Sequence, residues 1–565
     1  IKVIDPCMGS GHILCYLFDV LMQIYLDNGY SKREAVRSIL ENNLFGLDID
    51  KRAAQFAYFS VMMKAREYDS NFFSRSNIPQ PRVYDIQESN WLGGAYKHEM
   101  GNFLNSQQHR DTLNYLLDAF VDAKEYGSIL QIKPLNYEGL KEAWETSAAA
   151  TAHDANMAMW YDAAKDAVAQ LIEQAVMLSQ KYDAVVTNPP YMGSSGMGAN
   201  LTNFVKKYYP DSKSDLFAVF IEVCSHMAAE KRYQAMITQH AWMFLSSYEK
   251  LREKMLLTET VNMAHLGARA FEEIGGEVVQ TTSFVRCRTH IDGYKGTYCR
   301  LIEPTSQQGK EDMFLAGGNR YFVNQDNFAK IPGRPVAYWA STGALENYVC
   351  MGSVSDMGEG RIGLITGDAN RFLRLWSEVD FKRIGFDIHS NEESVKSGLK
   401  WFPTQKGGDF RKWYGNLDYI VNWENDGYEM KYDNYMGKRV RSHNYNGDLG
   451  FKKAITWTTI SSGNFACRFS GDGFIYDTAG PFFHVTDDRK LYMLLAFLDS
   501  KVANFYLKIM NPTINFPPGY IQAIPFSKEC QTDQIENLSK SCTDMSKNDW
   551  DAFETSWDFK KHPLV

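Results

Sequence analysis

The opening of the chain constrains the fold most, because a short strand runs through a glycine turn into a helix. Residues 1–4 predict a buried strand, and an apolar helical pattern extends to Leu26. Gly9 and Gly11, between the two, let the backbone approach a ligand closely. Strand, glycine turn and helix form the first unit of a nucleotide-binding α/β sheet, although a tight turn without a ligand has the same pattern.

Two further strands are predicted to end in acidic residues. Residues 44–50 contain Asp48, and an acid at that position can accept hydrogen bonds from both ribose hydroxyls of a nucleoside. Residues 82–86 contain Asp85, which would accept from the exocyclic amine of an adenine ring. Asp5 also ends its strand, at the edge where open α/β sheets bind ligands.

A fourth apolar run, residues 182–187, leads into Asn188, Pro189, Pro190 and Tyr191. Proline cannot continue a strand ladder, so the strand stops there and the corner is stiff. The Asn188 amide oxygen and the Pro189 carbonyl could accept from a planar amine, with the Tyr191 ring stacked on its face. A plain turn that ends a strand would use the same residue types.

These motifs, in this order, resemble those of the amino-methylating DNA methyltransferases, which use S-adenosylmethionine. The Asn-Pro-Pro-Tyr form resembles the adenine-N6 branch. A closer resemblance, carried by residues 39–50, 183–192, 366–376 and 406–416, is to the large adenine methyltransferases of BREX phage-defence systems, the PglX type. Type IIG restriction–modification enzymes share the motifs and stay an alternative.

The resemblance implies a Rossmann-like α/β sheet of about seven strands with an antiparallel last pair, and a site without metal. Catalysis would fall to Asn188, Pro189, Pro190 and Tyr191, with Phe271 as a second stacking face for the flipped base or as a core residue. The expected S-adenosylmethionine-binding residues are Asp5, Pro6, Met8, Gly9, Ser10, Gly11, Asp48, Ile49, Asp85 and Ile86.

At 565 residues the chain is too long for one core. We expect a catalytic domain over 1–340, a mixed α+β target-recognition domain over 341–530 and a polar tail over 531–565. An insertion over 86–180 has helical spacing and is expected to pack on the sheet, with a DNA-contacting arm as the alternative. Because the first residue already lies in a strand, an N-terminal part of the parent protein is expected to be absent.

The expected recognition domain combines basic residues with aromatic ones. Residues 371–453 hold 15 Lys and Arg against 12 Asp and Glu, while the whole chain carries −8. DNA binding by an acidic protein requires such segregation of positive charge, although intermixed charges usually form a solvated face. Lys406, Arg411 and Lys412 lie among glycines and aromatics and are predicted to contact double-stranded DNA.

Composition excludes some classes of protein. The nine cysteines show no metal-ligand spacing, and no apolar run has the roughly 18 residues that would span a membrane, so we expect a cytoplasmic protein. Other phage-defence proteins and phage-encoded inhibitors are possible partners. Two other functions stay open: methylation of protein glutamine, and a methyltransferase fold that serves as a DNA-binding scaffold.

Overall fold

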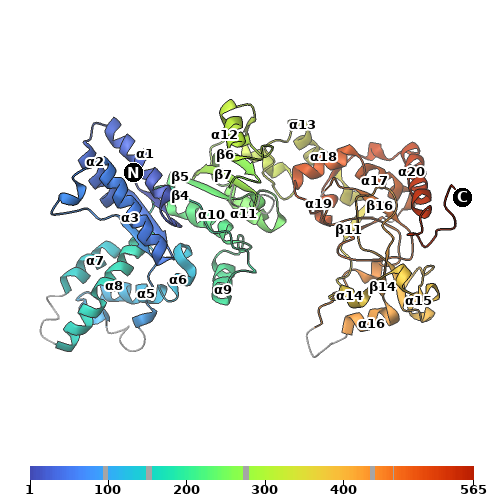
Figure 1. The fold of residues 1–565 in the computed structure, drawn as a ribbon, viewed down its shortest axis with the longest axis horizontal. Coiled ribbons are helices and arrows are strands. Elements are labelled where there is room, and N and C mark those ends of the chain that lie inside the picture. Colours follow the sequence, from blue (N-terminus) through green and yellow to red (C-terminus); the bar gives the residue numbers. More distant parts are fainter. Residues whose placement is uncertain are drawn as a thin grey trace. The chain divides into compact units, whose positions relative to one another are not determined.

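The computed structural model describes residues 1–92, 100–147, 155–271, 279–432, 440–461, 463–485 and 487–564, with the backbone alone over 155–160. The chain forms two compact units, Ile1–Asp326 and Asn327–Val565 (Figure 1). The division therefore falls earlier than the expected boundary at 340, and the expected tail is part of the second unit.

The first unit is built on a sheet of nine strands in the order β3-β2-β1-β4-β5-β7-β6-β8-β9. The pairs from β3 to β5 are parallel, and β7 runs antiparallel between β5 and β6. This is the predicted sheet with its antiparallel strand, extended by β8 and β9. The strands are β1 (Val3–Asp5), β2 (Leu44–Asp48), β3 (Arg82–Asp85), β4 (Tyr182–Thr187), β5 (Ala228–Gln239), β6 (Glu259–Gly267), β7 (Thr281–Cys287), β8 (Gly296–Arg300) and β9 (Arg320–Val323).

The helices of this unit cover the sheet with apolar faces. Leu14 and Phe18 of α1 and Ala57 and Val61 of α3 lie in one core with Val3 of β1. The described residues of 86–180 include four α-helices, joined by turns and irregular segments. The helices are α1 (His12–Asp27), α2 (Lys32–Ser38), α3 (Lys51–Tyr68), α5 (Gln107–Ala119), α6 (Ala123–Tyr126), α7 (Tyr137–Thr146), α8 (Ala155–Ser179), α9 (Ala199–Tyr208), α10 (Leu216–Met227), α11 (Glu249–Met255) and α12 (Gln307–Ala316).

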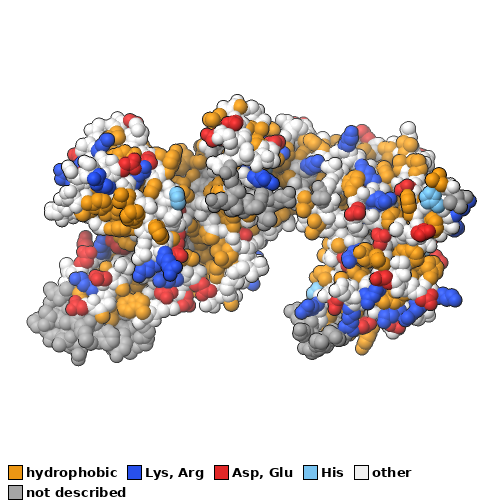
Figure 2. All heavy atoms as spheres, in the orientation of Figure 1, with side chains coloured by type: hydrophobic (Ala, Val, Ile, Leu, Met, Phe, Trp, Pro, Cys, Tyr) orange, Lys and Arg blue, Asp and Glu red, His pale blue; other side chains and the backbone are white. Residues whose placement is uncertain are grey.

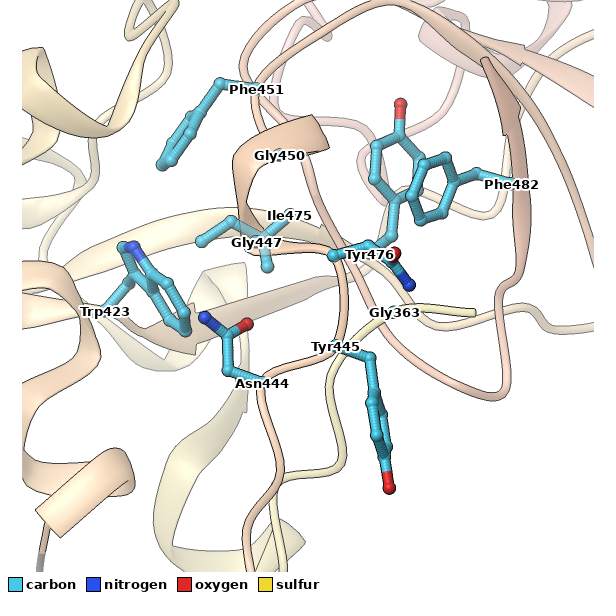
Figure 3. Close-up of a pocket in the computed structure, with 11 residues that line it drawn as sticks. Gly363, Trp423, Asn444, Tyr445, Gly447, Gly450, Phe451, Ile475, Tyr476 and Phe482 are labelled. Atoms are coloured by element: carbon cyan, nitrogen blue, oxygen red, sulfur yellow. The ribbon is translucent and has the colours of Figure 1, made fainter. Parts of the chain in front are cut away.

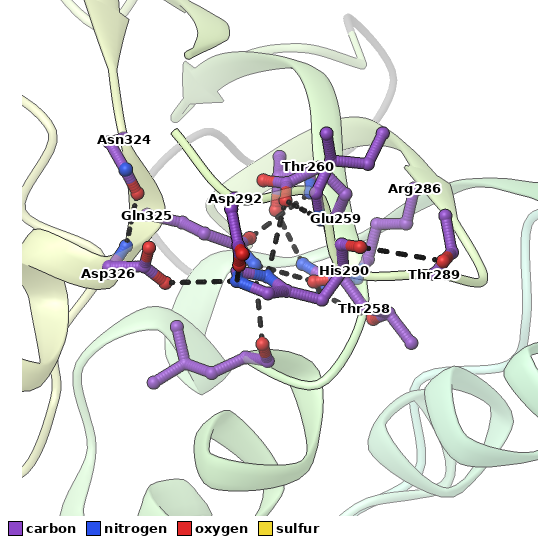
Figure 4. A network of polar contacts seen from close by, with 12 residues as sticks. Thr258, Glu259, Thr260, Arg286, Thr289, His290, Asp292, Asn324, Gln325 and Asp326 are labelled. Atoms are coloured by element: carbon purple, nitrogen blue, oxygen red, sulfur yellow. Dashed lines mark hydrogen bonds and ion pairs between the residues drawn. The ribbon is translucent and has the colours of Figure 1, made fainter. Parts of the chain in front are cut away.

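A cluster of polar side chains links Gln325, near the end of the first unit, to residues at the start of β6 (Figure 4). The Arg286 guanidinium donates to the Thr260 hydroxyl at 2.5 Å and to the Thr258 carbonyl at 3.0 Å. The Gln325 side chain accepts from the Thr260 N–H at 3.1 Å and donates to the same Thr258 carbonyl at 2.6 Å. Arg286 is near the carboxyl end of the antiparallel β7, so this cluster lies opposite the carboxyl ends of β1 and β4.

The second unit contains two four-stranded sheets, β11-β18-β15-β16 and β12-β14-β13-β17, and the pair β10-β19. Its largest core joins Ile455, Trp457 and Phe483 of the first of these sheets to Leu494 and Leu507. The strands are β10 (Gly352–Ser353), β11 (Gly358–Arg361), β12 (Leu373–Leu375), β13 (Trp401–Gln405), β14 (Tyr419–Asn422), β15 (Ala454–Trp457), β16 (Cys467–Ser470), β17 (Ile475–Tyr476), β18 (Phe482–Val485) and β19 (Pro525–Phe526).

The largely apolar residues 491–508 form parts of two helices. The chain turns at Asp499, whose buried carboxylate accepts from the Cys467 N–H at 2.9 Å, and Ser500 caps the next helix by accepting from the Ala503 N–H at 3.2 Å. The helices are α13 (Thr342–Cys350), α14 (Ala369–Phe372), α15 (Asn391–Ser397), α16 (Glu424–Tyr432), α17 (Asp488–Leu498), α18 (Lys501–Met510), α19 (Pro518–Gln522) and α20 (Asp533–Asp551).

Candidate active site

Asp5, the last residue of β1, is fully buried at the carboxyl edge of the sheet. Its Oδ1 accepts hydrogen bonds from the Thr187 hydroxyl at 2.7 Å and from the Cys7 N–H at 3.0 Å. Its Oδ2 has no partner among the described residues. Burial raises the pKa of Asp5 to about 7, although both hydrogen bonds act to lower it. A ligand that carries N–H groups or a positive charge would satisfy the free oxygen.

The glycine turn after β1 is tied to the end of β2. The Gly9 N–H donates to Asp48 Oδ2 at 2.9 Å, and Gly9 has a φ of +53°. Gly11 has a φ of +87°, and a Cβ added there would lie 2.9 Å from the Ala57 backbone of α3. Both the left-handed conformation and the close approach of α1 to α3 therefore require glycine at position 11. Ser10, between the two glycines, is exposed at the turn.

Two of the expected cofactor-binding residues, Met8 and Ile86, have side chains that pack in the core of the first unit. The Met8 side chain lies in the core, where a Cβ at Gly46 would meet its sulfur at 2.5 Å. Ile86 is fully buried, and its N–H donates to the Asp48 carbonyl at 2.7 Å. Both side chains pack in the core, and the expected place of these two residues in the cofactor site stays a prediction. By contrast, Ile49 is 55% exposed beside Asp48.

The end of β3 is braced by the helical insertion. Asp85 Oδ2 accepts from the Gln87 side chain at 2.7 Å, and the Asp85 carbonyl accepts from Gln174 of α8 at 2.9 Å. Gln174 is 1% exposed, and its Oε1 accepts from the Gln87 N–H at 2.9 Å. Asp85 remains half-buried at the carboxyl edge, so its predicted role as a ligand residue stays a prediction.

The insertion also reaches the glycine turn, which no motif in the sequence indicated. The Ser128 hydroxyl donates to the Pro6 carbonyl at 2.5 Å, and both residues are buried. Gly127 has a φ of +62°, and a Cβ there would meet Ile49 at 2.7 Å. Residues 127–129 thus cover one side of the predicted cofactor site. A signal was present only as the pair Gly127-Ser128, which is too common to indicate a site.

The predicted catalytic corner follows β4 and adjoins Asp5, because β1 and β4 are parallel neighbours. Asn188 and Pro190 are exposed, while Pro189 is buried. The Tyr191 ring is half-buried and packs edge-on against Phe217, with 6.0 Å between the ring centroids. Its hydroxyl has no partner among the described residues, and burial raises the pKa of Tyr191 to about 12.

Asp215, just before α10, holds Met192, the residue that follows this corner. Its Oδ1 accepts from the Met192 N–H at 3.0 Å and from the Phe217 N–H at 3.3 Å, and the Leu216 N–H donates to the Met192 carbonyl at 3.1 Å. Burial raises the pKa of Asp215, and these backbone bonds lower it. Its place before an apolar helical run could have identified it as a helix cap.

Two histidines that the sequence analysis did not predict as site residues lie at the carboxyl ends of β5 and β6. His240 Nδ1 is 2.9 Å from His265 Nε2, and burial lowers the pKa of His240 to about 4. Two neutral rings can share one N–H bond, so the pair joins the two strand ends. Phe271 follows β6 and is half-buried, and its predicted stacking role stays a prediction.

In the second unit, two of the predicted DNA contacts have partners within the unit, which stands against the prediction. Arg411 lies over the Trp550 ring of α20 at 4.9 Å from its centroid, and its Nη1 is 3.5 Å from Asp549 Oδ2. The Lys412 ammonium donates to the Asp499 carbonyl at 2.6 Å. Lys406 is half-buried, with its ammonium 4.6 Å from the Tyr419 ring centroid, and stays a prediction.

The surface charges and the internal cavity of the second unit bear on what this unit can bind. Around β14, α15 and α16, Lys and Arg side chains alternate with Asp and Glu on the face drawn in Figure 2. A cavity of about 10 Å³ lies among Gly363, Trp423, Tyr476 and neighbouring residues (Figure 3). It has room for about one water molecule, so it cannot hold a base or a cofactor.

Within the described ranges, no group of three or more His, Cys, Asp or Glu side chains could hold a metal ion. In the same ranges no helix has the length and apolar character needed to cross a membrane.

Residues 42–267 match the Eco57I restriction-modification methylase family. Over its whole length the chain is 42% identical to the adenine-specific methyltransferase PglX of Lacticaseibacillus casei (strain Zhang), of which it covers 47%. It is 38% identical over its whole length to the adenine-specific methyltransferase BrxX of Escherichia coli O9:H4 (strain HS), again covering 47%. The chain thus spans about half the length of these curated relatives.

Two solved structures share the fold. The DNA complex of the type IIL restriction-modification enzyme MmeI has a TM-score of 0.51 at 12% identity, over 100% of this chain and 68% of that chain. A nuclease-deletion mutant of the type ISP restriction-modification enzyme LlaGI, in complex with a DNA substrate mimic, has a TM-score of 0.51 at 11% identity. The match covers 96% of this chain and 44% of that chain. The Rossmann-like methyltransferase fold is confirmed, and this chain is similar over its whole length to the adenine-specific methyltransferases PglX and BrxX.

Proposed function

We propose that this chain carries the catalytic and target-recognition parts of an S-adenosylmethionine-dependent methyltransferase that modifies adenine N6 in double-stranded DNA and marks host DNA in a phage-defence system. One observation carries the proposal: the Thr187–Asp5 hydrogen bond of 2.7 Å joins the strand before the Asn188–Tyr191 corner to the strand before the glycine turn. A methyl donor and a methyl acceptor would therefore meet at one edge of the sheet.

The residues at this edge fit S-adenosylmethionine, which would supply a methyl group on a sulfonium. Asp5 Oδ2, buried and without a partner among the described residues, would accept from an ammonium group. Asp48 still has acceptor capacity for ribose hydroxyls beyond its bonds to the Gly9 and Asp50 N–H groups. The exposed Ile49 side chain would cover a face of the adenine ring, on the side that residues 127–129 close.

At the corner, the exposed Asn188 would accept from the N6 amine with its side-chain oxygen, and Pro189 with its carbonyl. The amine nitrogen becomes positively charged as the methyl transfers, so oxygens already directed at it stabilise the transition state more than the ground state. The target adenine must leave the duplex, which costs roughly a few kcal/mol. Stacking on Tyr191 would offset this by about 1–3 kcal/mol.

Three alternatives differ from this proposal in substrate or activity. A type IIG enzyme would cleave DNA as well as methylate it, and a scaffold would bind DNA without turnover. A protein glutamine methyltransferase would use the same corner on a peptide, which the large second unit argues against. Methyl transfer from labelled S-adenosylmethionine to duplex DNA and to protein substrates, with DNA integrity followed on a gel, separates all of these.

The decisive variant is Asn188→Ala. It should lose nearly all methyl transfer while S-adenosylmethionine and DNA still bind, because the amide acts on the reacting nitrogen. Tyr191→Ala should be partly rescued by a mismatched target base, which flips more easily. Substitution of the exposed Asn90, which lies outside the corner, by Ala serves as the control for activity. Robust turnover by a folded Asn188→Ala protein would contradict the catalytic role.

A further inference from the structure

The segment between the catalytic corner and α10 forms an excursion whose two ends meet at the corner. The chain leaves at Met192 and returns at Asp215, where the Met192 N–H donates to Asp215 Oδ1 at 3.0 Å. The Ser194 N–H donates to the Ser214 carbonyl at 3.0 Å, which closes the base of the excursion. Helix α9 is the body of this excursion, and it stands out from the sheet in Figure 1.

The helical insertion holds α9 in place. The Tyr126 ring stacks on Phe204 with 4.4 Å between centroids and 20° between planes. Glu125 accepts from the Asn200 side chain at 3.1 Å, and the Tyr209 hydroxyl donates to the Ile129 carbonyl at 2.7 Å. The same insertion segment contacts the glycine turn through Ser128, so one short segment joins the cofactor side of the site to α9.

The outer face of α9 is positively charged. Lys206 and Lys207 are exposed in its last turn, and Tyr208 beside them is 40% exposed. No carboxylate among the described residues pairs with either lysine or with the exposed Lys213. Of the two acids of the excursion, Asp211 pairs with Lys254 of α11 at 2.7 Å, and Asp215 accepts from the Met192 and Phe217 N–H groups. The charge of the excursion is thus unbalanced in a chain whose net charge is −8.

We propose that α9 is a DNA-contacting helix of the first unit, in which Lys206 and Lys207 bind backbone phosphates near the flipped adenine and Tyr126 positions the helix. This inference rests on the proposed function and adds a contact surface outside the recognition unit. Lys206 lies roughly 10 Å along α9 from Ala199, a length over which duplex DNA presents about six phosphates. Lys206 and Lys207, which have no carboxylate partner among the described residues, complement that charge, and the Lys207 ammonium lies 4.8 Å from the Tyr208 ring centroid.

The test uses the full chain with Lys206 and Lys207 both replaced by Ala. Specific and random duplexes should lose affinity by a similar factor, roughly 10-fold, and the slope of log affinity against log salt should fall by about two. S-adenosylmethionine binding should not change. The matched control replaces Lys32 and Arg33, a consecutive exposed basic pair on α2, by Ala, and should bind DNA as the unaltered chain does.

Two more variants keep the inference testable if the alanine variant folds poorly. Arginine at both positions should restore binding, because the charge is retained. Tyr126→Ala should weaken DNA binding without changing the salt slope, since it removes no phosphate contact. An unchanged affinity and slope for the Lys206/Lys207 variant would overturn the inference. Failure of the unaltered chain to methylate DNA that it binds would instead refute the proposed function alone.

Discussion

At the scale of single residues, Asp5 is the most unusual group at the sheet edge. A carboxylate normally has a low pKa because water and hydrogen bonds stabilise its charge, and burial removes the water. The two hydrogen bonds to Oδ1 do not compensate, so the pKa rises to about 7 from 3.8. The folded protein without ligand therefore holds a proton on Asp5 that the unfolded chain loses near pH 4. Its stability falls as pH rises through that window, about 4 to 7.

This shift predicts a pH-dependent affinity for S-adenosylmethionine. An ammonium group binds the charged form of Asp5, so affinity should rise as pH increases through about 7, and binding near neutral pH should release protons. Calorimetry in buffers of different ionisation enthalpy measures that release. Asp5→Asn should weaken binding and abolish the release. Asp85→Asn, which removes another carboxylate from the same edge, should leave the release in place, and an unchanged release in Asp5→Asn would refute the assignment.

At the scale of secondary-structure elements, α20 shows why basic residues next to aromatic ones are ambiguous in a sequence. Arg411 and Lys412 precede Trp413 and Tyr414, a pattern that also suits phosphate binding. In the fold, Arg411 lies on Trp550 of α20, and Lys547 of α20 lies over the Tyr414 ring at 5.0 Å from its centroid. These cation–π contacts attach the last helix to the second unit.

Arg411→Ala is therefore predicted to loosen α20 and not to reduce DNA binding. The lost cation–π contact should lower the free energy of unfolding of the second unit by about 0.5–1 kcal/mol, because Arg411 is partly exposed. Chemical denaturation, followed by tryptophan fluorescence, measures this change. Arg489→Ala, which removes ion pairs with Asp533 and Glu536 at the other end of α20, serves as the control. A large loss of DNA affinity at unchanged stability would restore the DNA-contact role.

At the scale of the whole molecule, each unit has its own buried core. We predict that residues 1–326 fold alone and bind S-adenosylmethionine with the affinity of the full chain, because every described residue of the proposed cofactor site lies within them. Sequence-specific DNA methylation should be lost, since we propose that target recognition lies within residues 327–565. Calorimetry and a methylation assay on the truncated protein measure both, and loss of cofactor binding by a folded 1–326 protein would contradict this division.

The sequence by itself determined the parallel half of the sheet and the edge at which the predicted site residues lie. Short apolar runs that lead into Asp5, Asp48, Asp85 and Asn188 predict strands, and parallel strands place their carboxyl ends at one edge. The left-handed backbone at Gly9 and Gly11 is likewise a local property, readable from residue type.

Only the tertiary structure decided which partners these residues have. Ser128 on Pro6, Tyr126 on Phe204 and Arg411 on Trp550 join residues far apart in the chain, and no local pattern encodes such pairs. Burial is equally non-local, because it depends on all the elements packed around a residue. The free oxygen and raised pKa of Asp5, the buried side chains of Met8 and Ile86, and the lack of a carboxylate partner for the α9 lysines among the described residues therefore appeared only in the fold.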